Sequence, residues 1–133
     1  MTQHFRYYTI GEASIVLCDN HGILSEQGDG GKILAQTDLS EREALFMERL
    51  LSWYPDPCPY PEHIHIACGW SEENCMRLYR VAQTNKTMTK LLSPVVGTIA
   101  KLRPKLTDFS IDIALYKYIG YCLCERSQFV RVA

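Results

Sequence analysis

Four side chains near the middle of the chain have the types that bind zinc. Cys58, His63, His65 and Cys68 follow one another in the pattern C-x4-H-x-H-x2-C. Zinc takes four thiolate or imidazole ligands in tetrahedral geometry, so this set is a candidate for a metal-dependent protein or a small enzyme. The prolines that flank Cys58 make a compact cage awkward, and we therefore predict no metal and no cofactor.

Patterns typical of catalysis are otherwise missing from the sequence. The stretch Gly28-Asp29-Gly30-Gly31 lacks the lysine and the following helix of a phosphate-binding loop. There is no G-x-S-x-G nucleophile elbow. The six cysteines come without a secretory signal or a C-x-x-C pair, so we interpret them as reduced, mostly buried thiols. We expect no catalytic residues and no enzymatic activity.

The charge of the chain is unevenly distributed. The net charge is −1, but residues 1–85 carry six Lys/Arg and twelve Asp/Glu, whereas residues 86–133 carry eight Lys/Arg and three Asp/Glu. A net charge of +5 in the last third is the electrostatic pattern of a segment that binds nucleic acid.

The segment Ser93–Leu106 has the pattern of an amphipathic helix. Ser93 is suited to cap it and Pro94 to occupy its first position. The apolar face contains Val95, Ile99, Leu102 and Leu106. Thr98, Lys101 and Lys105 are expected to face solvent or a ligand, and Pro104 to kink or end the helix. Gly97 costs about 1 kcal/mol relative to Ala within a helix, and it lets a partner approach the backbone closely.

The segment Phe109–Leu123 has the pattern of a β-hairpin. Ile111, Ile113 and Leu115 alternate with smaller or polar residues, and Lys117 lies at or near the predicted tip. A basic helix followed by such a hairpin is the layout of a winged helix-turn-helix, in which the helix fits the DNA major groove.

The residues before this segment predict a small sheet and further helices. Four short strands are expected at 5–10, 14–18, 22–25 and 32–36, with turns at 19–22 and 27–31. Ser40 and Glu43 form a capping-box pattern for a helix that runs to about Trp53, where a series of prolines ends it.

The positioning helix before Ser93 has two candidates. We take Ser71–Ala82, with residues 83–90 as a loop; in the alternative, residues 62–70 take this role and 71–82 form an inserted helix. The predicted fold class is α+β: a winged helix-turn-helix with an N-terminal four-stranded antiparallel sheet, three or more helices and a C-terminal hairpin wing. Residues 1–38 form the sheet, 39–126 the winged helix within the same compact domain, and 127–133 a tail or the start of a linker.

The end of the chain resembles a known family. Residues 99–106 and 116–123 resemble the I-x-x-L-R-x-x-L … V-R-G-x-G-Y-x-L signature of OmpR/PhoB-type winged helices. Leu39-Ser40-Glu41-Arg42-Glu43 resembles the L-T-x-x-E helix of that family, and the resemblance covers most of residues 5–125. The chain departs from the pattern at Gly97, at Pro104 and at Tyr118, where the family usually has Gly.

The resemblance implies a transcription regulator that binds double-stranded promoter DNA in a sequence-specific manner. Helix 93–106 would enter the major groove, and the wing would reach the backbone or the minor groove. The implied DNA-binding residues are Ser93, Gly97, Thr98, Ala100, Lys101, Arg103, Lys105 and Lys117. A contact with RNA polymerase is implied for Thr84, Asn85 and Lys86.

The chain has no room for a receiver domain before Leu39. In this respect it is similar to ToxR/CadC-like one-component regulators, among them the PsaE-like group that controls virulence or fimbrial genes. That similarity implies an activator in the cytoplasm, formed by the cytoplasmic part of a single-pass inner-membrane protein, with a membrane-bound partner and a dimer on DNA. The alternative is a winged-helix protein-interaction module that does not bind DNA.

Overall fold

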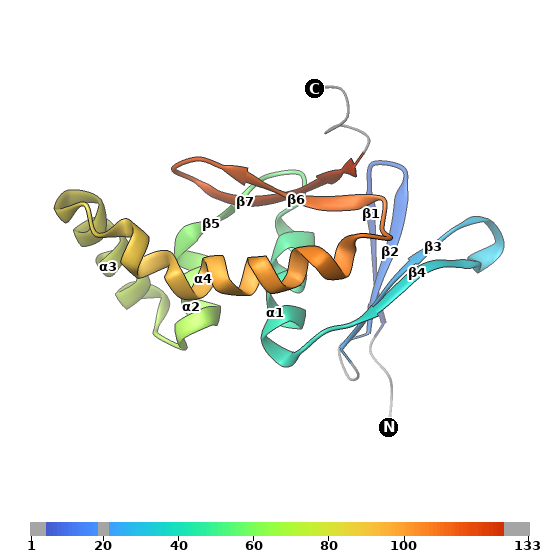
Figure 1. Ribbon diagram of the computed structural model, residues 1–133, viewed down its shortest axis with the longest axis horizontal. Helices are drawn as coiled ribbons and strands as arrows, with labels where there is room; N and C mark the ends of the chain where they lie inside the picture. Colours follow the sequence, from blue (N-terminus) through green and yellow to red (C-terminus); the bar gives the residue numbers. More distant parts are fainter. Residues whose placement is uncertain (1–4, 19–21, 127–133) are drawn as a thin grey trace.

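The computed structural model describes residues 5–18 and 22–126, which form an α+β fold with two antiparallel sheets. Figure 1 shows the N-terminal sheet at one end, the helices in the middle and at the other end, and a C-terminal hairpin across the top. The first sheet contains β1 (Phe5–Ile10), β2 (Ala13–Cys18), β3 (Ile23–Gln27) and β4 (Ile33–Asp38), with the 3-10 turn η1 (Asp29–Gly31) between the last two.

The four predicted N-terminal strands are confirmed, each to within a few residues. The strands pair in sequence order, β1-β2-β3-β4, with Ile10 opposite Ala13 in the first hairpin. Ile15, Leu17 and Leu24 are fully buried because alternate residues of these strands face the helices. The predicted turn at 19–22 falls largely outside the described residues.

Helix α1 (Glu41–Trp53) begins with the predicted capping box. The backbone N–H of Glu43 donates to Ser40 Oγ at 3.2 Å, and the Ser40 N–H donates to Glu43 Oε1 at 2.8 Å. Phe46 and Leu50 on the apolar face are buried, so α1 carries the centre of the core.

Both candidate positioning segments are helical. They are α2 (Tyr60–Cys68) and α3 (Glu72–Asn85), and both pack against α4 (Met88–Leu102). The predicted loop over residues 83–90 is wrong, because Lys86 and Thr87 alone separate α3 from α4. The polar residues after Ala82 form the solvated last turn of α3, which ends where Lys86 adopts a left-handed φ of 57°.

Helix α4 starts five residues before the predicted beginning. Ser93 and Pro94 therefore lie inside it, and the expected cap at Ser93 is wrong. The apolar face reaches back through Leu92 and Leu91 to Met88, and burial of this face outweighs the hydrogen bond that Pro94 removes. The prediction for Pro104 is confirmed: α4 ends at Leu102, and the 3-10 turn η2 (Arg103–Leu106) follows.

The predicted C-terminal hairpin is confirmed as β6 (Ile111–Tyr116) and β7 (Gly120–Glu125). The short strand β5 (Cys58–Pro59) pairs with β7, giving the sheet order β5-β7-β6. Gly120 permits this pairing, because a Cβ there would lie 1.8 Å from the carbonyl oxygen of Cys58.

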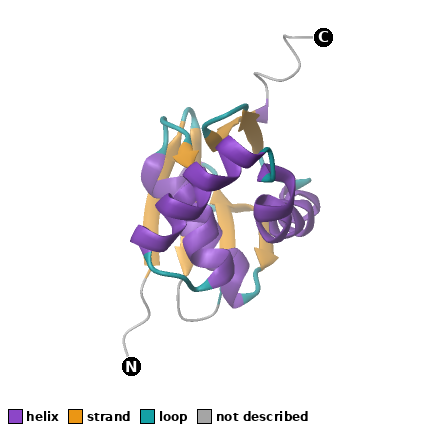
Figure 2. Cartoon of the chain, turned by 90° about the vertical axis from the view of Figure 1, so that its left-hand side faces the viewer, coloured by secondary structure: helices purple, strands orange, loops and turns teal. Residues whose placement is uncertain are grey.

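The hydrophobic core is continuous from the first sheet to the hairpin. Figure 2, viewed from the α3 end, shows helices in front of the strands of the N-terminal sheet. Buried Glu26 links the two sheets, because its Oε1 accepts a hydrogen bond from the Ser110 N–H at 2.6 Å. Within residues 5–18 and 22–126, no helix is long and apolar enough to cross a bilayer.

Candidate nucleic-acid interface

One side of α4 faces solvent and carries small or cationic side chains. Six of its residues, named below, fall within a third of a turn around the helix axis, because each residue of an α-helix advances by 100°. We call this set the exposed face of α4; it consists of Thr89, Lys90, Ser93, Gly97, Ala100 and Lys101, and the exposed residues Pro94 and Val96 border it on either side. Three small residues occupy its middle, and a lysine lies toward each end.

Gly97 lies at the centre of the exposed face. A Cβ built at this position would meet no atom within 4 Å, and its φ is not left-handed. The fold therefore has no steric need for glycine here, although glycine costs about 1 kcal/mol relative to Ala in a helix. An exposed, uncrowded glycine leaves the helix backbone open to close approach by another molecule.

The three cations expected near the C-terminal end of this helix have different surroundings. Lys101 is exposed and forms no ion pair with any described residue. Lys105 instead points back to α1, where its Nζ lies 2.6 Å from Glu43 Oε1. Burial alone would raise the pKa of Glu43, but hydrogen bonds from Lys105 and Ser40, together with the Lys105 charge, lower the pKa below its ordinary value.

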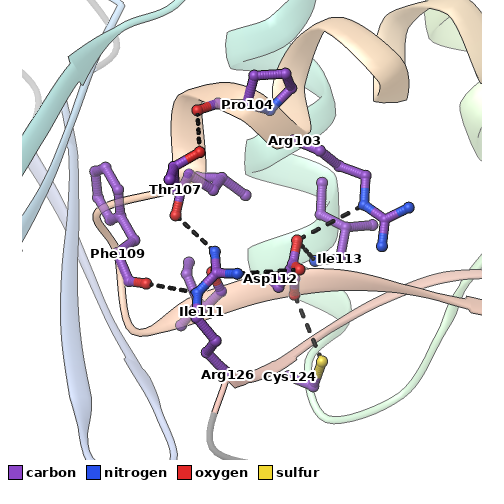
Figure 3. A network of polar contacts seen from close by, with 10 residues as sticks. Arg103, Pro104, Thr107, Phe109, Ile111, Asp112, Ile113, Cys124 and Arg126 are labelled. Carbon is purple, nitrogen blue, oxygen red and sulfur yellow. Dashed lines mark hydrogen bonds and ion pairs between the residues drawn. The ribbon is translucent and has the colours of Figure 1, made fainter. Parts of the chain in front are cut away.

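Arg103 belongs to a network at the base of the hairpin (Figure 3). Its Nε lies 3.7 Å from Asp112 Oδ1, and Arg126 Nη1 lies 3.4 Å from the other oxygen of the same carboxylate. The Arg126 guanidinium also donates to three carbonyls at 2.7 to 3.0 Å, those of Leu106, Phe109 and Ile111. Arg103 is half exposed, but its charge is already partly neutralised by Asp112.

Two residues predicted to contact DNA differ from expectation, one in its burial and the other in its position within α4. Thr98 is only 6% exposed, and its hydroxyl donates to the Pro94 carbonyl at 2.9 Å, so its placement on the outer face is wrong. Ser93 is exposed, but it lies in the second turn of α4. It therefore lacks the free N–H groups with which a helix start binds phosphate.

The tip of the β6–β7 hairpin is exposed and carries Lys117. Its Nζ lies 5.1 Å from the centroid of the Tyr118 ring, a cation–π geometry. Tyr118 adopts a left-handed φ of 71°, and its carbonyl accepts a hydrogen bond from the Tyr79 hydroxyl at 3.1 Å. This bond ties the tip to α3, and Figure 1 shows the hairpin running back along α4 toward that helix.

The residues for which the resemblance implies a contact with RNA polymerase lie at the junction of α3 and α4. Thr84 and Asn85 occupy the last turn of α3, and the Thr84 hydroxyl donates to the Arg80 carbonyl at 3.1 Å. Lys86 is exposed at the junction. Together with Lys90 it extends the positive charge of the exposed face beyond the start of α4.

The cysteine and histidine set is divided between core and surface. His63 is buried, stacked on Phe46 at 5.4 Å and edge-on to Tyr121 at 5.6 Å. Burial lowers the pKa of His63 to about 4, while the Cys58 backbone acts in the opposite direction. His65 contacts the Trp70 carbonyl through Nδ1. Among residues 5–18 and 22–126, no three such side chains come together as a metal site.

The sequence prediction missed Thr89 and Lys90, which it placed in a loop. The signal was present in the apolar residues Met88, Leu91 and Leu92, whose spacing continues the buried stripe of α4 by one more turn. Pro94 obscured this signal, because proline is far more common at the start of a helix than within it.

Comparisons with protein-family models, curated proteins and solved structures find no match to this chain.

Proposed function

We propose that this protein is a transcription regulator with a winged helix-turn-helix that binds double-stranded DNA. The observation that carries the proposal is the exposed face of α4. It combines a glycine without a structural role, small neighbours and two lysines that form no ion pair with any described residue, on a helix of 15 residues. An α-helix fits the major groove, and a smooth centre with cations at both ends suits contact with the two bordering phosphate backbones.

The β6–β7 hairpin supports the same proposal as a wing. It follows α4 and η2 directly, and it presents Lys117 at an exposed tip. The left-handed φ of Tyr118 is the backbone conformation that glycine, the usual residue in the resembled family, adopts without strain. Lys117 would then contact phosphate or the minor groove beside the helix.

The cations divide into two groups in this proposal. Lys86, Lys90, Lys101 and Lys117 contact phosphates, whereas Arg103 and Lys105 mainly hold the wing and α1 in place. Direct base contacts are few because Gly97 and Ala100 offer no polar side chains, so sequence-dependent DNA shape contributes to specificity. Thr84 and Asn85 remain available for RNA polymerase beside the DNA. We further propose that the protein binds a membrane-bound partner and dimerises on DNA, as ToxR-like regulators do.

The test is fluorescence anisotropy of labelled duplex DNA, repeated at several salt concentrations, with wild-type protein and two lysine variants. Lys101→Ala removes a cation from the exposed face of α4. Lys32→Ala removes another exposed cation, which lies beside β4, and serves as the matched control. Log Kd should change linearly with log salt, and Lys101→Ala should lower that slope by about 0.9, whereas Lys32→Ala should leave it unchanged.

If both substitutions change the slope of log Kd against log salt equally, the placement of DNA on α4 is contradicted. A complete lack of binding at low salt would favour the second candidate, a protein-interaction module. The exposed apolar side chains at the hairpin tip support that candidate, because exposed apolar patches often bind proteins. Leu115, Tyr118 and Ile119 are each at least half exposed.

A further inference from the structure

A cavity of about 460 Å³ opens on the surface between the hairpin tip, α2, α3 and the end of α1. None of the residues that line it is among those predicted to contact DNA or RNA polymerase. Most of its lining is apolar or aromatic, and it is large enough for a small molecule. The lining residues that matter for its chemistry are Trp53, Glu62, Glu72, Met76, Tyr79 and Tyr118.

Aromatic rings line this cavity from three separate elements. Trp53 comes from α1, Tyr79 from α3 and Tyr118 from the hairpin tip. The hydrogen bond from the Tyr79 hydroxyl to the Tyr118 carbonyl holds the last two elements together at the cavity. The faces of aromatic rings carry negative potential and attract cations.

Two carboxylates, from Glu62 on α2 and Glu72 on α3, share the cavity wall with the rings. Neither forms an ion pair with a described residue. Glu62 Oε2 is buried and has no hydrogen-bond partner among the residues that the structure describes. A buried carboxylate oxygen without a partner is costly, and a positive charge in the adjacent cavity would offset that cost.

We propose that this cavity binds a small organic cation, an ammonium group attached to an apolar or aromatic body. The carboxylates would balance the positive charge, and the rings would cover the ammonium methyl groups and the apolar body. An anion would face two negative groups. A neutral apolar molecule would leave the charges of Glu62 and Glu72 unbalanced.

The charge balance of the site favours a cation even with Lys117 nearby. The Lys117 ammonium lies over the Tyr118 ring and opposes a second positive charge. Two carboxylates outnumber this one lysine. Because its aromatic wall includes part of the hairpin tip, an occupied cavity would fix the position of the wing relative to α3. The proposal does not depend on DNA binding, and it is tested without DNA.

The experiment follows Trp53 fluorescence during titration with benzyltrimethylammonium. Trp53 and Trp70 are the two tryptophans of the chain, so Trp70→Phe leaves Trp53 as the sole reporter. The uncharged isostere neopentylbenzene serves as the matched ligand control. The double variant Glu62→Gln/Glu72→Gln removes the charges, and Tyr118→Leu removes one ring while the carboxylates stay. Circular dichroism melting verifies that each variant is folded.

Saturable quenching by the ammonium, with affinity at least about tenfold above that for the isostere, supports the proposal. The double variant should bind the ammonium about tenfold more weakly, and Tyr118→Leu about fivefold more weakly. Equal binding of the isostere, a response that does not saturate, or unchanged affinity in a folded variant would overturn it. If the double variant fails to fold, Tyr118→Leu and the isostere decide the question.

Discussion

Substitution of Gly97 separates the stability of α4 from its proposed contact with DNA. In Gly97→Leu the new side chain points into open space, because a Cβ at this position meets no atom within 4 Å. Leucine is a better helix former than glycine by about 0.8 kcal/mol. The free energy of unfolding should therefore rise by about that amount, and Tm by about 3 °C for a domain of this size.

The same substitution should weaken DNA binding. The leucine side chain would stand at the centre of the exposed face, between Ser93 and Lys101, where the proposal brings the helix backbone close to the groove. We expect a loss of at least about tenfold in affinity, which corresponds to about 1.4 kcal/mol. A more stable protein that binds DNA more weakly is an unusual combination, and destabilisation cannot produce it.

Urea unfolding and fluorescence anisotropy measure the two quantities on the same protein sample. Ser52→Leu adds comparable bulk at an exposed position of α1 and should leave DNA affinity unchanged. Higher stability with unchanged affinity would remove α4 from the interface. Unchanged or lower stability would show that Gly97 does have neighbours that restrict it, and the reasoning from its open surroundings would fail.

Three other substitutions test the wing and two buried groups. Lys117→Ala should weaken binding to all DNA sequences alike and reduce the salt slope by about one, as anisotropy on two unrelated duplexes would measure. Lys105→Met should cost about 1 kcal/mol at pH 7, measured by urea unfolding, because Glu43 loses its ion-pair partner. This cost should shrink as the pH falls below 4.5, since the pKa of Glu43 is lowered in the fold and its stabilising charge disappears on protonation. His63 has a pKa of about 4 in the fold and 6.5 as its ordinary value, so the unfolded chain takes up the proton first. The wild type should therefore lose about 2 kcal/mol between pH 6.5 and pH 4.5, a loss that His63→Phe should abolish while it preserves stacking on Phe46.

Each of these expectations has a distinct contrary result. Sequence-dependent losses in Lys117→Ala would make the tip a base-reading element. A cost of Lys105→Met that stays constant down to pH 3 would show that the ion pair is not its origin. An unchanged acid dependence in His63→Phe would place the responsible titrating group elsewhere.

The elements that sequence predicted well are those whose signals are local. The capping box at Ser40 and Glu43 fixes the start of α1, and alternation of apolar residues fixes β6. The start of α4 was missed because Pro94 is a strong local signal for a helix start, whereas burial of Leu92 in the core prevails over it. Local preference gave way to tertiary packing at this position.

The candidate site was less predictable than the fold, because ion pairing depends on residues far apart in sequence. Nothing near Lys105 indicates that it pairs with Glu43, which lies 62 residues earlier. The helical pattern likewise placed Thr98 on the outer face, whereas its burial depends on how α4 packs against its neighbours. The cavity beside the hairpin tip is lined by residues from several elements, so the sequence of any one segment does not predict it.

The hydrogen bonds between the first sheet and the hairpin have a consequence for synthesis of the protein. Glu26 binds the Ser110 N–H, and Glu125 Oε2 accepts from the Glu12 N–H at 3.3 Å, so partners 84 and 113 residues apart must meet. Chains emerge from the ribosome with the N-terminus first. The N-terminal strands therefore leave the exit tunnel long before their partners exist. Their contacts with the hairpin therefore form only when almost the whole domain has been made, and contacts of such long sequence separation slow folding.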